Sequence, residues 1–185
     1  MNNKRVMNYL LSWKIWCVVG VIIALTFSLS VSEQAVTGSA TATVVTQITL
    51  TASQALQFGN VYQGVPKTIA NNVDASSGVF EATGLDLAEI SLRLFLPEYL
   101  ALADNTDRMT IIFSATDCTV DSSGTVPSTP VGWVNENPRA LTVYKIGATN
   151  TQTNLYLGGK VVPSRFQKAG AYSGDIVLTA AYTGN

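Results

Sequence analysis

Apolar and polar residues alternate along several short segments of the chain, which is the pattern of β-strands with one face in a core. The clearest examples are residues 89–97, 108–115, 139–146, 153–162 and 174–182, all rich in β-branched or aromatic side chains. Turn-forming stretches such as "GNVYQGVP", "DASSG" and "NENP" separate them. Short strands with such turns predict an all-β fold, an immunoglobulin-like β-sandwich of antiparallel or mixed strands.

Two stretches depart from this alternation. Residues 96–105, "LPEYLALADN", are expected to hold a single helical turn. Residues 121–130, "DSSGTVPSTP", are dominated by serine, threonine, glycine and proline, and are expected to form the least ordered loop.

The first predicted strand is unusually long. Its alternation runs from Gly38 to Leu50 and extends back towards Val36, whereas strands typically have about 5–6 residues. One face carries Val36, Gly38, Ala40, Ala42, Val44, Thr46, Ile48 and Leu50. Two interpretations are open: one bent strand that crosses both sheets, or a strand whose first half pairs with another subunit. The small residues near its start would suit a narrow groove of another subunit, as the second interpretation requires.

The N-terminal segment has the features of an export signal. Lys4, Arg5 and Lys14 precede an apolar run over residues 15–31, and small polar residues follow it. We therefore predict a signal peptide, or an N-terminal anchor, over residues 1–32. Residues 33–50 form an N-terminal extension or possible donor strand, and residues 51–185 form the β-sandwich domain. The domain is expected to be exported through the secretory pathway to the cell surface or the extracellular space.

The charge of the chain limits its partners. All 12 acidic residues follow residue 32, whereas Lys4, Arg5 and Lys14 precede it, so the exported part is mildly acidic. A nucleic-acid partner would require a basic face, and none is expected. Cys118 is interpreted as a small half-buried side chain beside a loop, with an intermolecular disulfide as the alternative.

The sequence lacks the residues of common catalytic sites. It contains no histidine, which removes the usual general base and the commonest metal ligand. Asp104, Asp107, Asp117 and Asp121 lie in turn-like sequence, where aspartate ordinarily caps backbone groups. We predict that the protein is not an enzyme and needs no cofactor or metal. Aromatic residues that could instead stack on sugars are Tyr62, Tyr99, Trp133, Tyr144 and Tyr156.

Two motifs resemble a known family. Phe58-Gly59-Asn60-Val61 with Gly64 opens the domain, and "LYLGGKVVP" followed by Gly170-x-Tyr172-Ser173-Gly174 closes it. Together they resemble the two ends of the bacterial domain-of-unknown-function family 4402, whose members look like exported β-sandwiches comparable to pilus subunits. Gly59 suits a bulge or corner, and Gly158-Gly159 suits a tight turn with positive φ.

The likeness to pilus subunits implies a way of assembling. In subunits of the chaperone–usher type, the N-terminal extension of one subunit completes the sheet of the next. The donor strand would present the face that begins with Val36. The acceptor edge would be the last strand, with Tyr172, Gly174, Ile176, Leu178, Ala180 and Tyr182. Such a head-to-tail contact does not close on itself and therefore gives a filament.

The predicted function is thus a structural subunit of an extracellular pilus-like or fimbria-like filament with a role in cell adhesion. Its partners would be copies of itself, together with an assembly chaperone or outer-membrane export machinery. The alternative is a monomeric secreted β-sandwich module that binds carbohydrate or matrix, for which Trp133 is a candidate contact.

Overall fold

The computed structural model describes residues 42, 44, 46–123 and 126–184. It contains thirteen strands and, in these residues, no helix. The strands are β1 (Thr49–Gln54), β2 (Lys67–Ile69), β3 (Gly78–Thr83), β4 (Glu89–Phe95), β5 (Tyr99–Leu102), β6 (Arg108–Ile112), β7 (Cys118–Asp121), β8 (Gly132–Glu136), β9 (Val143–Lys145), β10 (Gln152–Leu157), β11 (Gly159–Val162), β12 (Tyr172–Ser173) and β13 (Val177–Tyr182).

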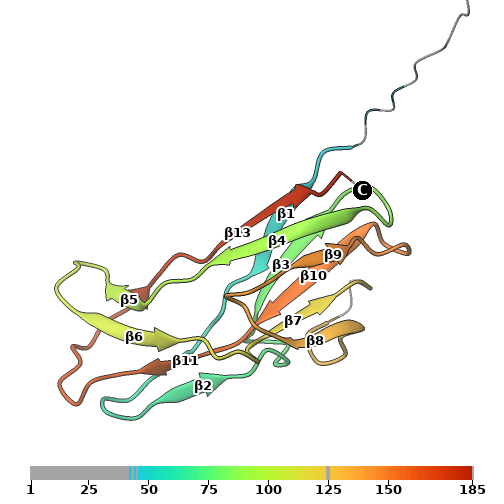
Figure 1. Ribbon diagram of the computed structural model, residues 1–185. Coiled ribbons are helices and arrows are strands. Elements are labelled where there is room, and N and C mark those ends of the chain that lie inside the picture. Colours follow the sequence, from blue (N-terminus) through green and yellow to red (C-terminus); the bar gives the residue numbers. More distant parts are fainter. Residues whose placement is uncertain (1–41, 43, 45, 124–125, 185) are drawn as a thin grey trace, which may run out of the picture. The chain divides into compact units, whose positions relative to one another are not determined.

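The strands form three sheets (Figure 1). Sheet A has the order β1-β3-β10-β7-β8, sheet B has β12-β5-β6-β11-β2, and sheet C has β13-β4-β9. The strand pairs within them are antiparallel. The predicted all-β sandwich is confirmed, and the immunoglobulin-like subtype stays a prediction.

Sheets A and C share one apolar core. β4 contributes Ile90, Leu92 and Leu94 at every second position, and all three are buried. Buried residues of β3 and β10 complete this part of the core: Phe80, Ala82, Leu155 and Leu157. Alternation along β4 thus produces the burial that the sequence predicted for residues 89–97.

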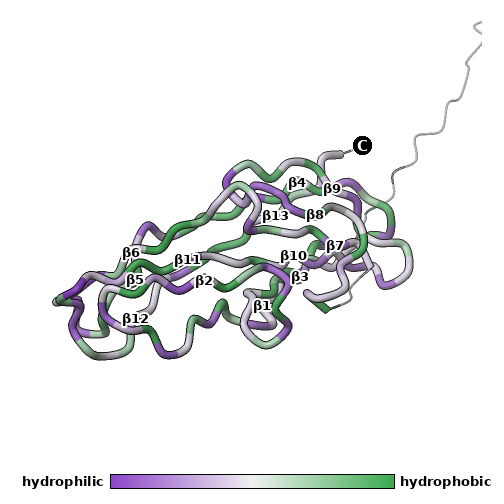
Figure 2. The backbone as a smooth tube through the Cα atoms, turned by 90° about the horizontal axis from the view of Figure 1, so that it is seen from below, coloured by the Kyte–Doolittle hydropathy of each residue, from purple (hydrophilic) through white to green (hydrophobic). Residues whose placement is uncertain are grey.

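Sheet B continues strands of the other two sheets. β11 follows β10 after Gly158 alone, β5 follows β4 across three residues, and β13 follows β12. Figures 1 and 2 show β5 and β6 at one end of the body and the C-terminal residues at the other. The flank that carries β12 and β13 therefore connects the two ends.

Most predicted strands are present, with shorter bounds. Residues 108–115 contain β6, 139–146 contain β9, and 174–182 contain β13. Residues 153–162 contain most of β10 and all of β11, with the break at Gly158.

The helical turn predicted over residues 96–105 is wrong. This stretch contains β5, which pairs with β6 on one side and with β12 on the other. Because both neighbours supply backbone partners, tertiary pairing determines the conformation here rather than local propensity. The loop over residues 121–130 also has fixed contacts where it is described: Asp74 accepts hydrogen bonds from the Ser128 amide (2.7 Å) and hydroxyl (2.8 Å).

The single strand predicted over residues 38–50 is not observed. Strand structure begins at Thr49, where Thr49 and Leu50 pair with Thr83 and Ala82 of β3. The strand then continues to Gln54, so the predicted boundary between residues 50 and 51 falls inside β1. Ala42, Val44 and residues 46–48 have no strand pairing. Val36, Gly38, Ala40 and the segment 1–32 lie outside the described residues.

Gly158 and Gly159 do not have the predicted positive φ. The described glycines with positive φ are Gly59, Gly64, Gly132, Gly170 and Gly184. A Cβ at Gly158 would lie 2.6 Å from both the Asn71 amide nitrogen and the Ile69 carbonyl oxygen. Close backbone packing, rather than φ, therefore requires glycine where β10 becomes β11. Gly59 does have a positive φ of 59°, as a corner requires.

Cys118 is more deeply placed than predicted, since its side chain is fully buried in β7. Burial is the main cause that raises the pKa of its thiol, and the negative charge of Glu136 adds to it. In the part of the chain that is described, we find no helix suited to cross a membrane.

Candidate assembly groove

A groove with a volume of about 980 Å³ opens on the flank of the body over sheet B. One wall is formed by residues 55–63, which follow β1. The other wall is formed by residues 167–174 and Ile176, which include β12. Apolar side chains of β5, β6 and β11 line its floor: Leu100, Met109, Ile111 and Val161.

The two walls are joined at one end. The Gly64 amide donates to the Ser164 carbonyl (3.0 Å), and Gln63 Nε2 donates to the Gln167 carbonyl (2.6 Å). Gly64 has φ of 68°, and a Cβ there would lie 3.3 Å from Cγ of Arg165. The loops 59–66 and 163–170 therefore lie side by side, and we call this end the groove mouth.

Asp107 holds the second wall in place. Its Oδ2 accepts hydrogen bonds from the Tyr172 hydroxyl (2.7 Å), Gln167 Nε2 (2.7 Å) and the Lys168 amide (2.8 Å). Its Oδ1 accepts from the Arg108 amide (2.8 Å). The turn before β6 thus anchors three positions of a segment about sixty residues later in the chain.

These hydrogen bonds also shift the titration of the pair. Donation from Tyr172 and from the Lys168 amide lowers the pKa of Asp107 to about 2. Desolvation, together with the hydrogen bond to Asp107, raises the pKa of Tyr172. Asp107 therefore remains ionised, and Tyr172 protonated, over the whole ordinary pH range.

Two glycines let the second wall approach sheet B closely. Gly170 has φ of 148°, and a Cβ there would lie 2.5 Å from Cδ1 of Leu102. A Cβ at Gly174 would lie 3.1 Å from Cδ2 of Leu100 and 3.2 Å from the Tyr99 carbonyl oxygen. A larger side chain at either position would push the wall outward and change the width of the groove.

The groove borders open sheet edges. β12 and β13 are terminal strands of sheets B and C, and β1 is a terminal strand of sheet A. In the described part of the chain, β13 pairs with β4 and β12 pairs with β5, each on one side. An edge strand presents backbone donors and acceptors that an added strand can use.

The opposite end of the flank is closed by Tyr182. Its hydroxyl donates to the Thr46 carbonyl (2.9 Å) and accepts from the Leu85 amide (2.8 Å). We call this end, with Thr46 and the loop 84–88, the exit end. Val44 is 96% exposed and so lies outside the core.

The predicted acceptor residues lie along one edge, in two groups. Tyr172, Gly174 and Ile176 line the groove itself. Further along β13, the half-buried side chains are Leu178, Ala180 and Tyr182, which pack against the core. Alternation along β13 is therefore as the sequence predicted.

The predicted donor residues divide differently. Leu50 lies in β1 and pairs with β3, and Ile48 packs against the core. The Thr46 carbonyl accepts a hydrogen bond from Tyr182. Ala42 and Val44 are exposed. Thr46, Ile48 and Leu50 are therefore engaged within their own chain.

Sequence reasoning missed most of the first wall and the anchor of the second. Phe58, Gly59 and Val61 were noticed as a motif but not as part of a site, although they line the groove. Asp107 was assigned only to a turn. The "FGNV" motif next to the first strand was a usable signal, whereas the pairing of Asp107 with Tyr172 joins residues too distant in sequence to be recognised.

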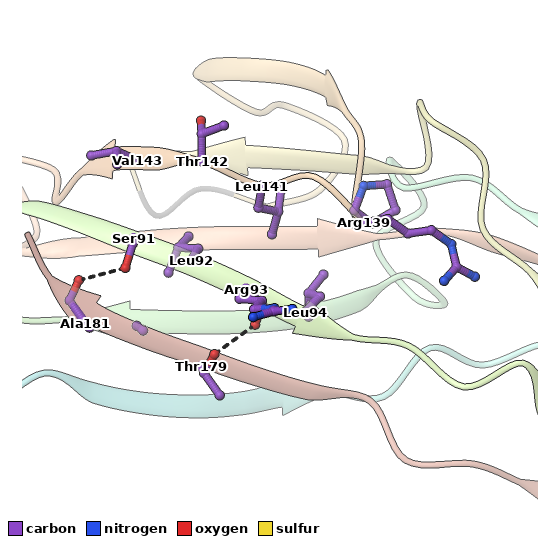
Figure 3. Close-up of a pocket in the computed structure, with 12 residues that line it drawn as sticks. Ser91, Leu92, Arg93, Leu94, Arg139, Leu141, Thr142, Val143, Thr179 and Ala181 are labelled. Atoms are coloured by element: carbon purple, nitrogen blue, oxygen red, sulfur yellow. Dashed lines mark hydrogen bonds between the residues drawn. The ribbon is translucent and has the colours of Figure 1, made fainter.

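A second hollow, of about 560 Å³, lies beside β4 and the segment 138–143 (Figure 3). Arg93 and Arg139 are its charged residues, and the Arg93 guanidinium lies 5.1 Å from the ring centroid of Phe95. Its hydroxyls bond within the sheet: Ser91 donates to the Ala181 carbonyl (3.4 Å) and Thr179 to the Arg93 carbonyl (3.3 Å).

None of the aromatic residues considered for sugar stacking lines this second hollow. Tyr144 and Tyr156 are buried and cannot stack on a ligand. Tyr62 is 74% and Tyr99 40% exposed. The side chain of Trp133 lies outside the described part of the chain.

Comparison with models of known protein families and with curated proteins found no match to this chain. The likeness to family 4402 therefore stays a prediction from the residues quoted for it. The groove is interpreted from its own geometry.

Proposed function

We propose that the protein is a structural subunit of a cell-surface filament, in which the extension of one subunit fills the groove of the next by strand addition. The observation that carries the proposal is the arrangement of the flank. The extension leaves at the exit end beside Tyr182, whereas the groove lies at the other end of the same flank. A subunit with its donor and acceptor at opposite ends polymerises head to tail.

The chemistry of the two surfaces is compatible. The extension over residues 36–45, "VTGSATATVV", carries no charge. Of the residues that line the groove, only Lys168 is charged, and the floor is apolar. Burial of a neutral strand of small side chains against this floor is favourable, while the open edge of β12 and β13 supplies backbone partners.

The proposal is tested by placing one charge on either face of the extension. Ala42→Asp would bury a carboxylate in the groove, which costs several kcal/mol without a partner. We expect this variant to form no filaments by light scattering and negative-stain electron microscopy. The neighbouring change Thr43→Asp places the same charge on the other face and is the matched control. Equal assembly of both variants would contradict strand addition.

A second experiment separates the donor from the acceptor. Deleting residues 36–45 removes the donor but no residue of the described core, which begins with Ile48. The deletion variant should be a folded monomer that binds a synthetic peptide of residues 36–48. A folded deletion variant that ignores the peptide would contradict an acceptor role for the groove.

A monomeric binding module is the second candidate. The observation in its favour is the hollow between Arg93 and Arg139 beside the half-exposed Phe95. This function predicts that the wild-type chain stays monomeric at all concentrations and that Arg139→Ala weakens binding of an acidic oligosaccharide. Filament formation by the wild type would argue against it.

A further inference from the structure

The two ends of the flank carry exposed apolar side chains, and of those named below only Tyr62 also lines the groove. At the groove mouth, Tyr62 is 74%, Val65 54% and Phe166 91% exposed. At the exit end, Leu85 is 41% and Leu87 60% exposed. Such side chains are costly to leave in water as a group, and clusters of them commonly mark interfaces.

Leu87 has a second unusual property. Its φ is 56°, a left-handed conformation that branched and bulky residues rarely adopt. Asparagine or glycine would adopt it more easily, and neither would expose apolar surface. A strained leucine on an exposed turn therefore suggests a contact that the turn makes with another molecule.

The charges of the two ends are complementary. The mouth segments 59–67 and 163–170 contain Lys67, Arg165 and Lys168 and no acidic residue. The exit segment 84–89 contains Asp86 and Glu89 and no basic residue. The charge of Lys168 interacts with that of Asp104, and Lys145 pairs with Glu89 (4.0 Å), so Arg165 and Asp86 are the clearest opposite charges.

We propose that these surfaces form a direct contact between the bodies of neighbouring subunits, in addition to the donated strand. The exit-end patch, Leu85, Asp86 and Leu87, docks on the mouth patch, Tyr62, Val65, Arg165 and Phe166, of a second copy of this chain. The inference rests on the proposed function. A donor strand whose Thr46 end lies at the mouth brings the exit end of its own subunit to that place.

The contact is tested by the critical concentration for filament assembly. Loss of one buried Phe or Leu side chain should raise this concentration by about tenfold. We expect this for Phe166→Ser and for Leu87→Asn. Val134→Ser is the matched control, because Val134 is 51% exposed on β8, at the edge of sheet A opposite β1. It should leave assembly unchanged.

Two further measurements exclude loss of folding as the cause. Leu87→Asn relieves the left-handed strain, so its melting temperature should equal or exceed that of the wild type. Charge reversal gives an independent check. Asp86→Lys and Arg165→Glu should each weaken assembly, and the double variant should recover part of the loss.

The outcomes distinguish the contact from strand addition. If Phe166→Ser and Leu87→Asn assemble at the wild-type concentration while the deletion variant still binds the 36–48 peptide, the body contact is wrong and strand addition stands. If the peptide does not bind and the wild type forms no filaments, both are wrong. Peptide binding with a raised critical concentration in both variants supports both.

Discussion

Two aspartate–tyrosine pairs organise two different regions of this molecule. In sheet A, the Tyr156 hydroxyl donates to Asp121 (3.0 Å), and both side chains are fully buried. At the groove, the Tyr172 hydroxyl donates to Asp107 (2.7 Å) on a half-exposed wall. The same pair of side chains therefore lies in the buried interior at sheet A and beside an open groove at sheet B.

The difference lies in what covers each pair. Asp121 also accepts from the amides of Ser123 (2.8 Å) and Val131 (3.2 Å), which holds the described part of the 121–131 segment over the outer face of sheet A. Asp107 instead positions a wall beside a groove that no described residue fills. The first region is covered by its own chain, whereas the second borders an open groove.

Replacing Asp121 should have the largest effect. Asp121→Ala leaves the Tyr156 hydroxyl and two backbone amides without this acceptor in a buried site, which we expect to cost about 3 kcal/mol or more of unfolding free energy. Urea unfolding followed by tryptophan fluorescence measures it. The control is Asp74→Ala, whose exposed carboxylate accepts hydrogen bonds from Ser128 alone among the described residues, with an expected loss of about 1 kcal/mol. Equal losses would remove the distinction between the regions.

Replacing Asp107 should affect binding more than folding. Asp107→Ala removes a shared acceptor from Tyr172, Gln167 and the Lys168 amide, so the wall loosens while the core of sheets A and C stays intact. We expect the 36–48 peptide to bind about tenfold more weakly to the deletion variant, with a smaller loss of stability than for Asp121→Ala. Asp104→Ala, in the same turn, is the control because Asp104 bonds only to Thr106 among the described contacts. Unchanged peptide affinity would show that the wall plays no part.

Removing the Tyr182 hydroxyl should have a smaller effect. Tyr182→Phe loses the hydrogen bonds to the Thr46 carbonyl and from the Leu85 amide, at a site open to water. The expected loss is about 1 kcal/mol in unfolding free energy. Hydrogen exchange of the Leu85 amide should quicken, whereas amides of β10 should not respond. A response in β10 would mean that the exit end and the core unfold together.

The smallest effect is the pH dependence of the groove wall. The pKa of Asp107 is lowered to about 2 in the folded chain from an ordinary 3.8, so its ionised form stabilises the fold fully above pH of about 4. That contribution is lost as the pH falls from about 4 to about 2. The melting temperatures of the wild type and Asp107→Asn should therefore converge over this range. A difference that is constant with pH would rule out the carboxylate as the source.

The fold was predictable where one face of a strand is buried and the other exposed. β4 and β13 show this alternation clearly. β7 has only four residues, all of them buried, and β2 and β12 have only three and two residues. These strands exist because their neighbours pair with them. A single sequence does not display such pairing.

The site was predictable in part for a similar reason. The alternation along β13 indicates which of its side chains face the core. The position of the extension before the first strand is likewise read from the sequence. The groove, however, is assembled from segments near residues 58, 107 and 172. Hydrogen bonds between such distant positions depend on the register of the sheets, which composition and spacing do not determine.

The buried position of Cys118 has a consequence for its reactivity. Thiolates, not thiols, form disulfides, and the raised pKa of this group together with its full burial keeps it protonated and inaccessible in the folded chain. An oxidant can therefore react with it only before folding or during opening of the fold. The rate at which a thiol reagent labels Cys118 thus reports how often the molecule opens, and folding itself protects the chain from mixed disulfides.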